Sequence, residues 1–383
     1  MSKMKALAEA TATLIGTIIG AGIFAIPYVS AKAGFLTALI DIVLIGLLVM
    51  LMNLYVGEVC LRTRGIHQLT GYAARYLGKW GRRLMAFSMV FGIYGALVAY
   101  LVGEGEVLFA IFGFGSQLLY SLIFFAAASL IVYFGLKTIA KSELIFVPLM
   151  LAIVGVIFFF GFKHIDFGNL GEFSLKRIFI PYGVVLFAYG ATAAVPEMRE
   201  ELLKKENLLK KSIILGMIIS MVIYAVFAML VVGITGKATT EVATIGLGNV
   251  LGEAMLLLGN IFAVFAMFTC FITLAFALKG MYNYDYGLGD KLSWFLSCII
   301  PFGVFFAIRK FVGFAKIIEA TGAIGLGLTG ILVVLMAKRS EKLGNRQPEY
   351  RMPKNFVFSF MIIALYVFGM LYAIADVIGF RFF

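Results

Sequence analysis

The stretch Gly16-Thr17-Ile18-Ile19-Gly20-Ala21-Gly22-Ile23-Phe24-Ala25-Ile26-Pro27 places three glycines and a proline inside an otherwise apolar segment. In a helix interior a glycine costs about 1 kcal/mol relative to alanine and a proline about 3 kcal/mol, so a continuous helix is disfavoured here. We expect the helix to break near Gly20. In a bilayer, the unpaired backbone groups of a break are tolerated only where protein or a wet cavity surrounds them. The stretch therefore predicts a binding site at the depth of the break.

The composition of the whole chain indicates whether that break lies in water or in a membrane. The 383 residues are 62% hydrophobic and 14% charged, and the mean hydropathy is +1.04. A soluble domain has about 25% charged residues, so we predict an all-α polytopic membrane protein whose partner is the lipid bilayer. The formal charge of +12 does not indicate nucleic acid, because basic residues of membrane proteins gather in cytoplasmic loops. The three cysteines have no paired metal-ligand spacing, and we predict no resident cofactor.

About 20 apolar residues cross the hydrocarbon core as a helix, and charges, glycines and prolines divide the chain into about eleven such spans. The predicted spans are 6–32, 35–60, 83–111, 117–136, 143–162, 175–200, 208–235, 253–282, 292–308, 312–337 and 355–379. Between the second and third, residues 65–83 alternate basic and aromatic side chains and predict a short amphipathic helix at the headgroup level. The loops are too short for a soluble catalytic domain, so residues 1–383 are expected to form one transmembrane domain.

The distribution of Lys and Arg predicts the orientation. The loops at 62–83, 199–211 and 338–354 are rich in basic residues and fall on the same side as the N-terminus. The positive-inside rule therefore predicts a cytoplasmic N-terminus and, with an odd number of spans, a C-terminus outside the cell membrane.

The sixth span, Ile180 to Glu197, is a second interrupted segment, with Gly183, Gly190, Thr192 and Pro196 inside it. It lies five spans after the first. A pair of interrupted helices at corresponding positions is typical of transporters built from two inverted repeats, with the binding site between the two breaks. We expect residues 6–162 and 175–337 to form the repeats and residues 355–379 to add an extra helix.

Four stretches resemble the amino acid–polyamine–organocation superfamily, which has the LeuT-type 5+5 inverted-repeat fold with broken helices 1 and 6. They are the opening stretch, Tyr94 to Glu106, Phe187 to Glu197, and Ala266 to Phe271. The opening stretch is most similar to the hydroxy/aromatic amino acid permeases and the related amino acid/auxin permeases. The resemblance implies a transporter of amino acids.

The two predicted breaks offer opposite partial charges. The N-terminus of a half-helix carries about +0.5 charge and suits a carboxylate, and glycines there leave room for an anion to approach the backbone. By analogy with the family, the first break holds the α-carboxylate of the substrate, and carbonyls of the sixth span receive its α-ammonium. The predicted substrate-binding residues are Gly20, Ala21, Gly22, Ile23, Phe187, Ala188 and Gly190. The alternatives are close helix packing for the glycines, since Gly16 and Gly20 are four apart, and an ordinary core position for Phe187.

For the coupling ion, the resemblance implies a sodium site in which carbonyls of the first span meet a cluster from the eighth. The matching residues are Gly16, Ile19, Ala266, Thr269 and Cys270. Cys270 departs from the family pattern, because a thiol is a poor ligand for a hard cation. The alternative is that Thr269 bonds back to its own helix while Cys270 packs.

Proton coupling competes with sodium coupling. Ionisable residues at membrane depth are costly and are therefore functional candidates, here Glu104, Glu106 and Glu319. Glu104 and Glu106 project in opposite directions from their helix, so at most one should face the site, and we favour Glu106. Glu319 is expected to pair with Lys316, three residues away. The absence of a basic residue in the middle of the fifth span favours sodium, by analogy with proton-coupled relatives that carry a lysine there.

We therefore predict a secondary active amino acid transporter with alternating access, coupled to sodium. The alternatives are a proton-coupled transporter or exchanger and, from another class, a membrane nutrient sensor. An integral-membrane enzyme is not expected, because the two histidines, His67 and His164, fall in loops predicted on opposite sides of the membrane.

Overall fold

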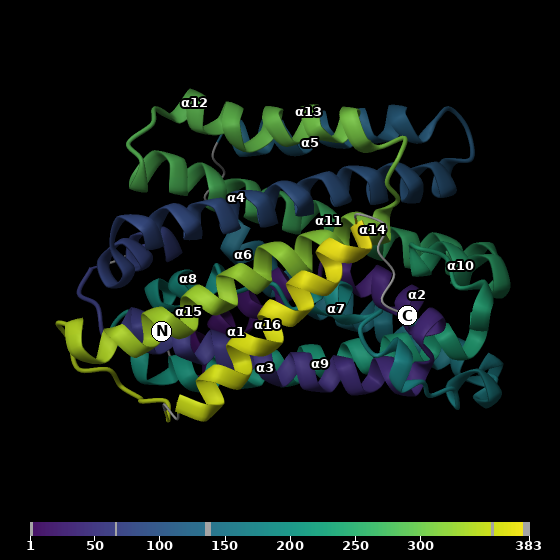
Figure 1. Ribbon diagram of the computed structural model, residues 1–383. Helices are drawn as coiled ribbons and strands as arrows, with labels where there is room; N and C mark the ends of the chain where they lie inside the picture. The colour runs from purple at the N-terminus through teal and green to yellow at the C-terminus, as the bar shows by residue number, and fades with distance from the viewer. Residues whose placement is uncertain (1–2, 66, 135–138, 354–355, 378–383) are drawn as a thin grey trace.

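The computed structural model describes residues 3–65, 67–134, 139–353 and 356–377, and within these ranges every regular element is helical (Figure 1). The helices are α1 Lys3–Ile18, α2 Ala21–Ala33, α3 Phe35–Leu61, α4 Leu69–Phe112, α5 Gln117–Phe134, α6 Ile139–Gly161, α7 Tyr182–Ala188, α8 Ala194–Glu201, α9 Leu209–Thr235, α10 Ala243–Leu251, α11 Glu253–Gly280, α12 Asp290–Trp294, α13 Ile300–Ile308, α14 Phe314–Ala320, α15 Gly327–Leu343 and α16 Phe356–Val377. Wider π-helical turns, η6 Met281–Asp285, η7 Phe295–Ile299 and η8 Thr321–Leu326, continue three of these helices.

Length and hydropathy confirm a polytopic membrane protein. Within the described ranges, eight helices are long and apolar enough to cross a membrane, and the bent pair α1 and α2 makes a ninth. The pair α7 and α8 falls below that length because each half-helix is short, and the described apolar part of α16 is Ser359–Ala375. The predicted eleven spans therefore remain a prediction. Residues 135–136, 355 and 378–379, at the ends of the predicted fourth and eleventh spans, lie outside the described residues.

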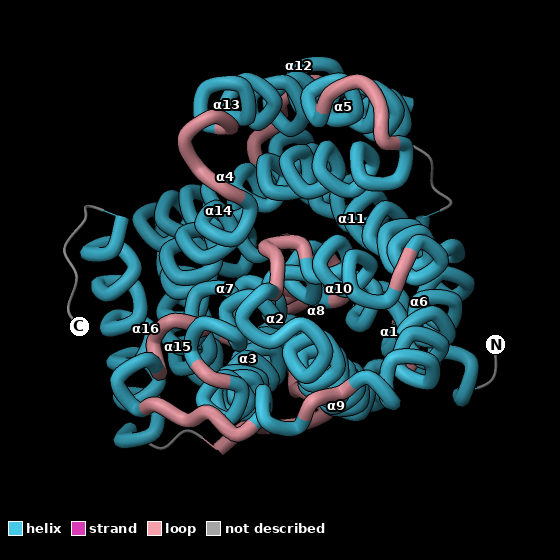
Figure 2. Tube along the Cα trace, turned by 90° about the vertical axis from the view of Figure 1, so that its right-hand side faces the viewer, coloured by secondary structure: helices cyan, strands magenta, loops and turns pink. Residues whose placement is uncertain are grey.

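The bundle has a peripheral layer and a central group. Figures 1 and 2 both show α5, α12 and α13 together on one side of α4, with α3 and α9 on the opposite side of the bundle. The rings of Phe125 on α5 and Phe302 on α13 stack with their centroids 3.8 Å apart. The broken pairs α1–α2 and α7–α8 lie in the central group, and the site is built there.

At one end of the bundle, a polar network joins loops that the sequence predicts to be cytoplasmic. The Arg199 guanidinium donates hydrogen bonds to the carbonyl oxygens of Thr63, at 3.0 Å, and Gly65, at 2.9 Å. Its Nε lies 3.3 Å from a carboxylate oxygen of Glu206, whose second oxygen lies 2.7 Å from Arg346. Three loops far apart in sequence therefore meet at one end.

At the other end, loops predicted to be outside are bonded to the first turns of α3 and α14. The amide of Ser174 donates to the Thr37 hydroxyl at 2.8 Å, and the amide of Ala315 donates to the Glu241 carboxylate at 3.0 Å. Since α7 follows this end and α8 finishes at the Arg199 network, the two short helices together connect the two ends.

Two elements differ from the sequence-based expectation. The predicted amphipathic helix at 65–83 is the first part of α4, which turns at Gly78 and continues into the third span. Gly78 has a φ of 74° there, a left-handed conformation that favours glycine. Helix α10, between the seventh and eighth spans, was not predicted, because its nine residues are too short to show a helical period clearly.

Candidate functional site

The first span breaks at the predicted place. Helix α1 ends at Ile18, α2 begins at Ala21, and the two are bent by 53°. Gly20 has non-helical angles, φ −128° and ψ −144°. The amides of Ala21 and Gly22 are the first two of α2, which a helix leaves without an intrahelical acceptor. Two backbone donors are thus placed at the positive end of a half-helix.

The second break is longer. Helix α7 ends at Ala188 and α8 begins at Ala194, with residues 189–193 between them outside any helix. The turn is tightened by a hydrogen bond from the amide of Gly190 to the carbonyl oxygen of Phe187, 2.8 Å long. This break therefore places a short irregular segment, with its own side chains, opposite the first break.

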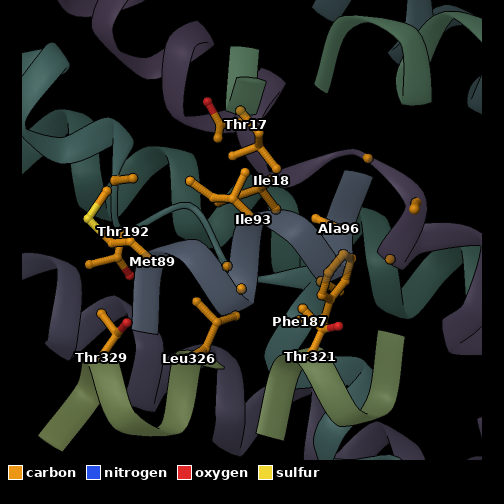
Figure 3. Close-up of a pocket in the computed structure, with 18 of the residues that line it drawn as sticks. Thr17, Ile18, Met89, Ile93, Ala96, Phe187, Thr192, Thr321, Leu326 and Thr329 are labelled. Atoms are coloured by element: carbon orange, nitrogen blue, oxygen red, sulfur yellow. The ribbon is translucent and has the colours of Figure 1, made fainter. Parts of the chain in front are cut away.

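A cavity of about 70 Å³ lies between the two breaks. Six of the seven predicted substrate-binding residues line it, and Ile23 is not among the lining residues. Helices α4, α11 and α15 and the η8 turn complete the wall, and Figure 3 shows part of it. The lining residues from the two breaks are Thr17, Ile18, Gly20, Ala21, Gly22, Phe187, Ala188, Gly190, Thr192 and Ala193.

Tyrosines of the sixth span and of α4 divide between this cavity and the packing around it. Tyr100 lines the cavity. The Tyr189 hydroxyl instead donates to the carbonyl oxygen of Ile42 at 3.1 Å, and the Tyr94 hydroxyl donates to that of Leu296 at 2.6 Å. Periodicity alone does not distinguish these orientations, because each helix is buried on several sides.

The glycines of the first break lie against other atoms of the protein, so packing alone explains them without the expected approach of an anion. A Cβ atom at Gly22 would overlap Ala188, so α2 and α7 touch backbone to backbone at this point. A Cβ atom at Gly20 would lie 2.8 Å from the Cys270 sulfur and 3.1 Å from the Tyr100 hydroxyl. Both glycines are therefore required by contacts within the protein, whatever the cavity binds.

Tyr224 on α9 joins the two breaks and was missed by the sequence-based reasoning. Its hydroxyl oxygen lies 2.6 Å from the carbonyl oxygen of Ile18 and 2.8 Å from that of Ala188, and the side chain is fully buried. These are the last residues of α1 and α7, where carbonyls lose their helical donors. The sequence feature that could have identified Tyr224 is a polar side chain in the middle of an apolar span.

The predicted sodium residues come together only in part. The Cys270 sulfur lies 3.4 Å from the carbonyl oxygen of Gly16 and 3.7 Å from that of Ile19, so the thiol occupies the position beside both carbonyls. The Thr269 hydroxyl donates within its own helix, to carbonyl oxygens of Phe265 at 3.0 Å and Ala266 at 3.1 Å. This is the alternative arrangement that the sequence left open.

The three candidate carboxyl groups lie in different environments. Glu104 on α4 has 0% exposure, and neither of its carboxyl oxygens has a hydrogen-bond partner among the described residues. Glu106 is partly exposed, so the structure places Glu104, rather than the favoured Glu106, in the interior. Glu319 lies 3.4 Å from the Lys316 ammonium, which confirms the predicted pair. Among the described residues, no group of three or more His, Cys, Asp or Glu side chains is arranged to hold a metal.

Two broken helices that face each other across a cavity, inside a bundle of long apolar helices, are typical of the class of secondary transporters. Comparison with known proteins identifies the family within that class. The chain belongs to the tryptophan/tyrosine permease family, which it matches over residues 3–373. The prediction of a permease rather than an enzyme is thereby confirmed, as is the resemblance to the aromatic amino acid permeases.

Two relatives show the range of substrates named among similar proteins. The chain is 28% identical over 221 residues to tyrosine-specific transport system 1 of Haemophilus influenzae, a match that covers 56% of this chain and 54% of that protein. It is 24% identical over 354 residues to glutamine transporter 2 of Aliivibrio fischeri, covering 86% of this chain and 89% of that protein. The chain thus spans about half the length of the first relative and most of the second.

Proposed function

We propose that this protein is a secondary active amino acid transporter that binds its substrate in the cavity between the two breaks. The observation that carries this proposal is that both breaks line one cavity, with Ala21 and Gly22 from the first break and Phe187, Ala188 and Gly190 from the second. An α-amino acid carries an anionic and a cationic group on adjacent atoms. The amides of Ala21 and Gly22 suit its carboxylate, and carbonyls of the sixth span suit its ammonium.

The shape of the cavity supports alternating access. Its lining continues from the breaks to Leu69, which follows the loop at the Arg199 network and therefore lies toward the predicted cytoplasmic side. Toward the other side, the ring of Phe24 packs against those of Phe262 and Phe227, at centroid distances of 5.2 and 6.3 Å. In this arrangement the lining extends toward the predicted inner side, and packed rings of α2, α9 and α11 lie toward the predicted outer side.

We propose sodium as the coupling ion, held by the carbonyl oxygens of Gly16 and Ile19. Binding would require the Cys270 thiol and the Thr269 hydroxyl to change orientation. A specific observation favours the proton as a second candidate. The Glu104 carboxyl group is fully buried without a partner among the described residues, and a charged group in that position costs several kcal/mol. It lies one helical turn from Tyr100, which lines the cavity.

Uptake into proteoliposomes tests the function and separates the two ions. We expect accumulation of labelled tyrosine or glutamine when an ion gradient is imposed. If sodium couples, a sodium gradient drives uptake and Thr269→Ala abolishes it. If the proton couples, a pH gradient suffices, Thr269→Ala has no effect, and Glu104→Gln removes accumulation while exchange of substrate persists. Binding of an amino acid without any transport would instead support a sensor, and the absence of both would overturn the proposal.

A further inference from the structure

The cavity has two chemically different ends. Figure 3 shows Ala96, Phe187 and Thr321 at one end and Met89, Thr192 and Thr329 at the other. The first end adjoins the break in the first span, where backbone donors are available. The second end is rich in hydroxyl groups, since Ser88 also lines the cavity and its oxygen lies 2.7 Å from that of Thr329. An amino acid whose α-groups bind at the break would extend its side chain toward these hydroxyls.

The hydroxyl groups that line the cavity differ in whether they already donate a hydrogen bond within the protein. Thr17 donates to Thr13 within α1 at 2.8 Å, and Thr321 donates to Ile317 within its own helix at 2.6 Å. Ser88 donates to the carbonyl oxygen of Gly325 at 2.6 Å or to Thr329. Each of these hydroxyl protons therefore already has an acceptor inside the protein.

Among the threonine and serine residues that line the cavity, Thr192 is the exception. Its side chain is 1% exposed and lines the cavity, yet its hydroxyl oxygen has no hydrogen-bond partner among the described residues. A buried hydroxyl that lacks a partner is unfavourable, and a ligand group that supplies the missing bond is correspondingly favoured. The irregular segment 189–193 holds this side chain in place without using its hydroxyl.

The absence of charge on the cavity wall restricts the class of ligand further. Among the described residues, those that line the cavity are all neutral and include no Asp, Glu, Lys, Arg or His. A charged side chain on the substrate would lose its hydration without gaining an opposite charge. The cavity therefore suits neutral amino acids.

We propose that Thr192 is the specificity-determining residue of the substrate site, and that it selects neutral amino acids whose side chain ends in a hydroxyl or carboxamide group. Both kinds of group donate and accept hydrogen bonds, so either can pair with the threonine hydroxyl. The inference rests on the proposed transport function, because it assumes that an amino acid occupies the cavity. The named substrates of the two relatives, tyrosine and glutamine, belong to these two classes.

Two near-isosteric pairs of ligands test this inference on the purified full-length protein. Dissociation constants are measured for L-tyrosine against L-phenylalanine and for L-glutamine against L-methionine. We expect the wild type to prefer the polar member of at least one pair by about tenfold, which corresponds to one hydrogen bond. Thr192→Val should bring that ratio close to one, whereas Thr192→Ser, which keeps the hydroxyl, should preserve it.

Thr244 on α10 provides a matched control. Its hydroxyl is also buried without a partner among the described residues, but it does not line the cavity, so Thr244→Val should leave the ratio unchanged. A melting temperature without ligand establishes that each variant is folded. A ratio that persists in folded Thr192→Val, or a wild type that prefers phenylalanine and methionine, would overturn the inference. A wild type that binds none of the four ligands would instead overturn the proposed function.

Discussion

The two breaks of the bundle differ in length and in what surrounds them. Between α1 and α2, Ile19 and Gly20 leave the helical path, and their surroundings are so close that a Cβ atom at Gly20 would lie 2.8 Å from the Cys270 sulfur. Between α7 and α8, five residues leave it, and Thr192 among them reaches the cavity wall. At the first break, Gly20, Ala21 and Gly22 thus line the cavity with almost no side chain, which suits groups that all amino acids share. The second adds a side chain, which suits discrimination between them.

The largest effect is expected from substitution in the tight break. Gly22→Val would place a side chain against the backbone of Ala188, where α2 and α7 touch. Overpacking typically costs about 1–3 kcal/mol, and a collision with backbone belongs at or above the upper end of that range. We expect loss of folded, monodisperse protein on size-exclusion chromatography in detergent.

Gly155→Val on α6 is the control for this substitution, because a Cβ atom there meets no atom of the described chain within 4 Å. Normal folding of both variants would mean that α2 and α7 are not in backbone contact, and the contrast between the two breaks would lose its basis.

A smaller effect is expected where the breaks are joined. Tyr224→Phe removes the hydroxyl that lies between the carbonyl oxygens of Ile18 and Ala188, and it leaves both carbonyls without that donor. The cost should be about 1–3 kcal/mol, seen as a lower melting temperature in detergent. Tyr182→Phe is the control, since the buried Tyr182 hydroxyl has no partner among the described residues, and its removal should be neutral or stabilising. Equal melting temperatures for the two variants would show that the breaks are not coupled through Tyr224.

The smallest effect concerns the inner half-helices. The Thr13 hydroxyl on α1 donates to the Glu201 carboxylate on α8 at 2.9 Å. This bond joins the half-helix before the first break to the half-helix after the second. Thr13→Val should lower the free energy of unfolding by about 1 kcal/mol, because the bond is only partly buried. Thr11→Val, two residues earlier, removes a hydroxyl bonded within α1 at 2.7 Å and should not loosen α8. Hydrogen exchange of α8 amides distinguishes the two, and equal exchange in both variants would contradict a tether.

The sequence predicted the breaks because their cause is local. Glycine and proline disfavour a helix wherever they stand, so the interruptions at Gly20 and between Phe187 and Pro196 could be located without a structure. Six of the seven predicted substrate-binding residues line the cavity between those interruptions. The pairing of Lys316 with Glu319 was predictable for the same reason, since both lie on one helix three residues apart.

Contacts across the bundle could not be predicted in this way. Whether Glu104 or Glu106 faces inward depends on how α4 is rotated against its neighbours, and the sequence favoured the partly exposed one. The role of Tyr224 depends on the meeting of three helices at one point. The function of Gly22 was assigned to an approaching anion, whereas the nearest atoms belong to Ala188, 166 residues later in the chain. Single-sequence patterns carry no information about such partners.

The central claim is that the cavity between the breaks binds the amino acid, and Gly92 offers the most direct test of it. Gly92 on α4 lines the cavity, and a Cβ atom there would meet no atom of the described chain within 4 Å, so a larger side chain would enter the cavity itself. Gly303→Leu on α13, at an exposed position with similar free space, is the control. The measurement is the rise in melting temperature on adding tyrosine or glutamine, which reports ligand concentration relative to Kd. We predict that Gly92→Leu keeps the melting temperature of the ligand-free wild type but loses this rise, while Gly303→Leu retains it. An undiminished rise in folded Gly92→Leu would contradict the claim.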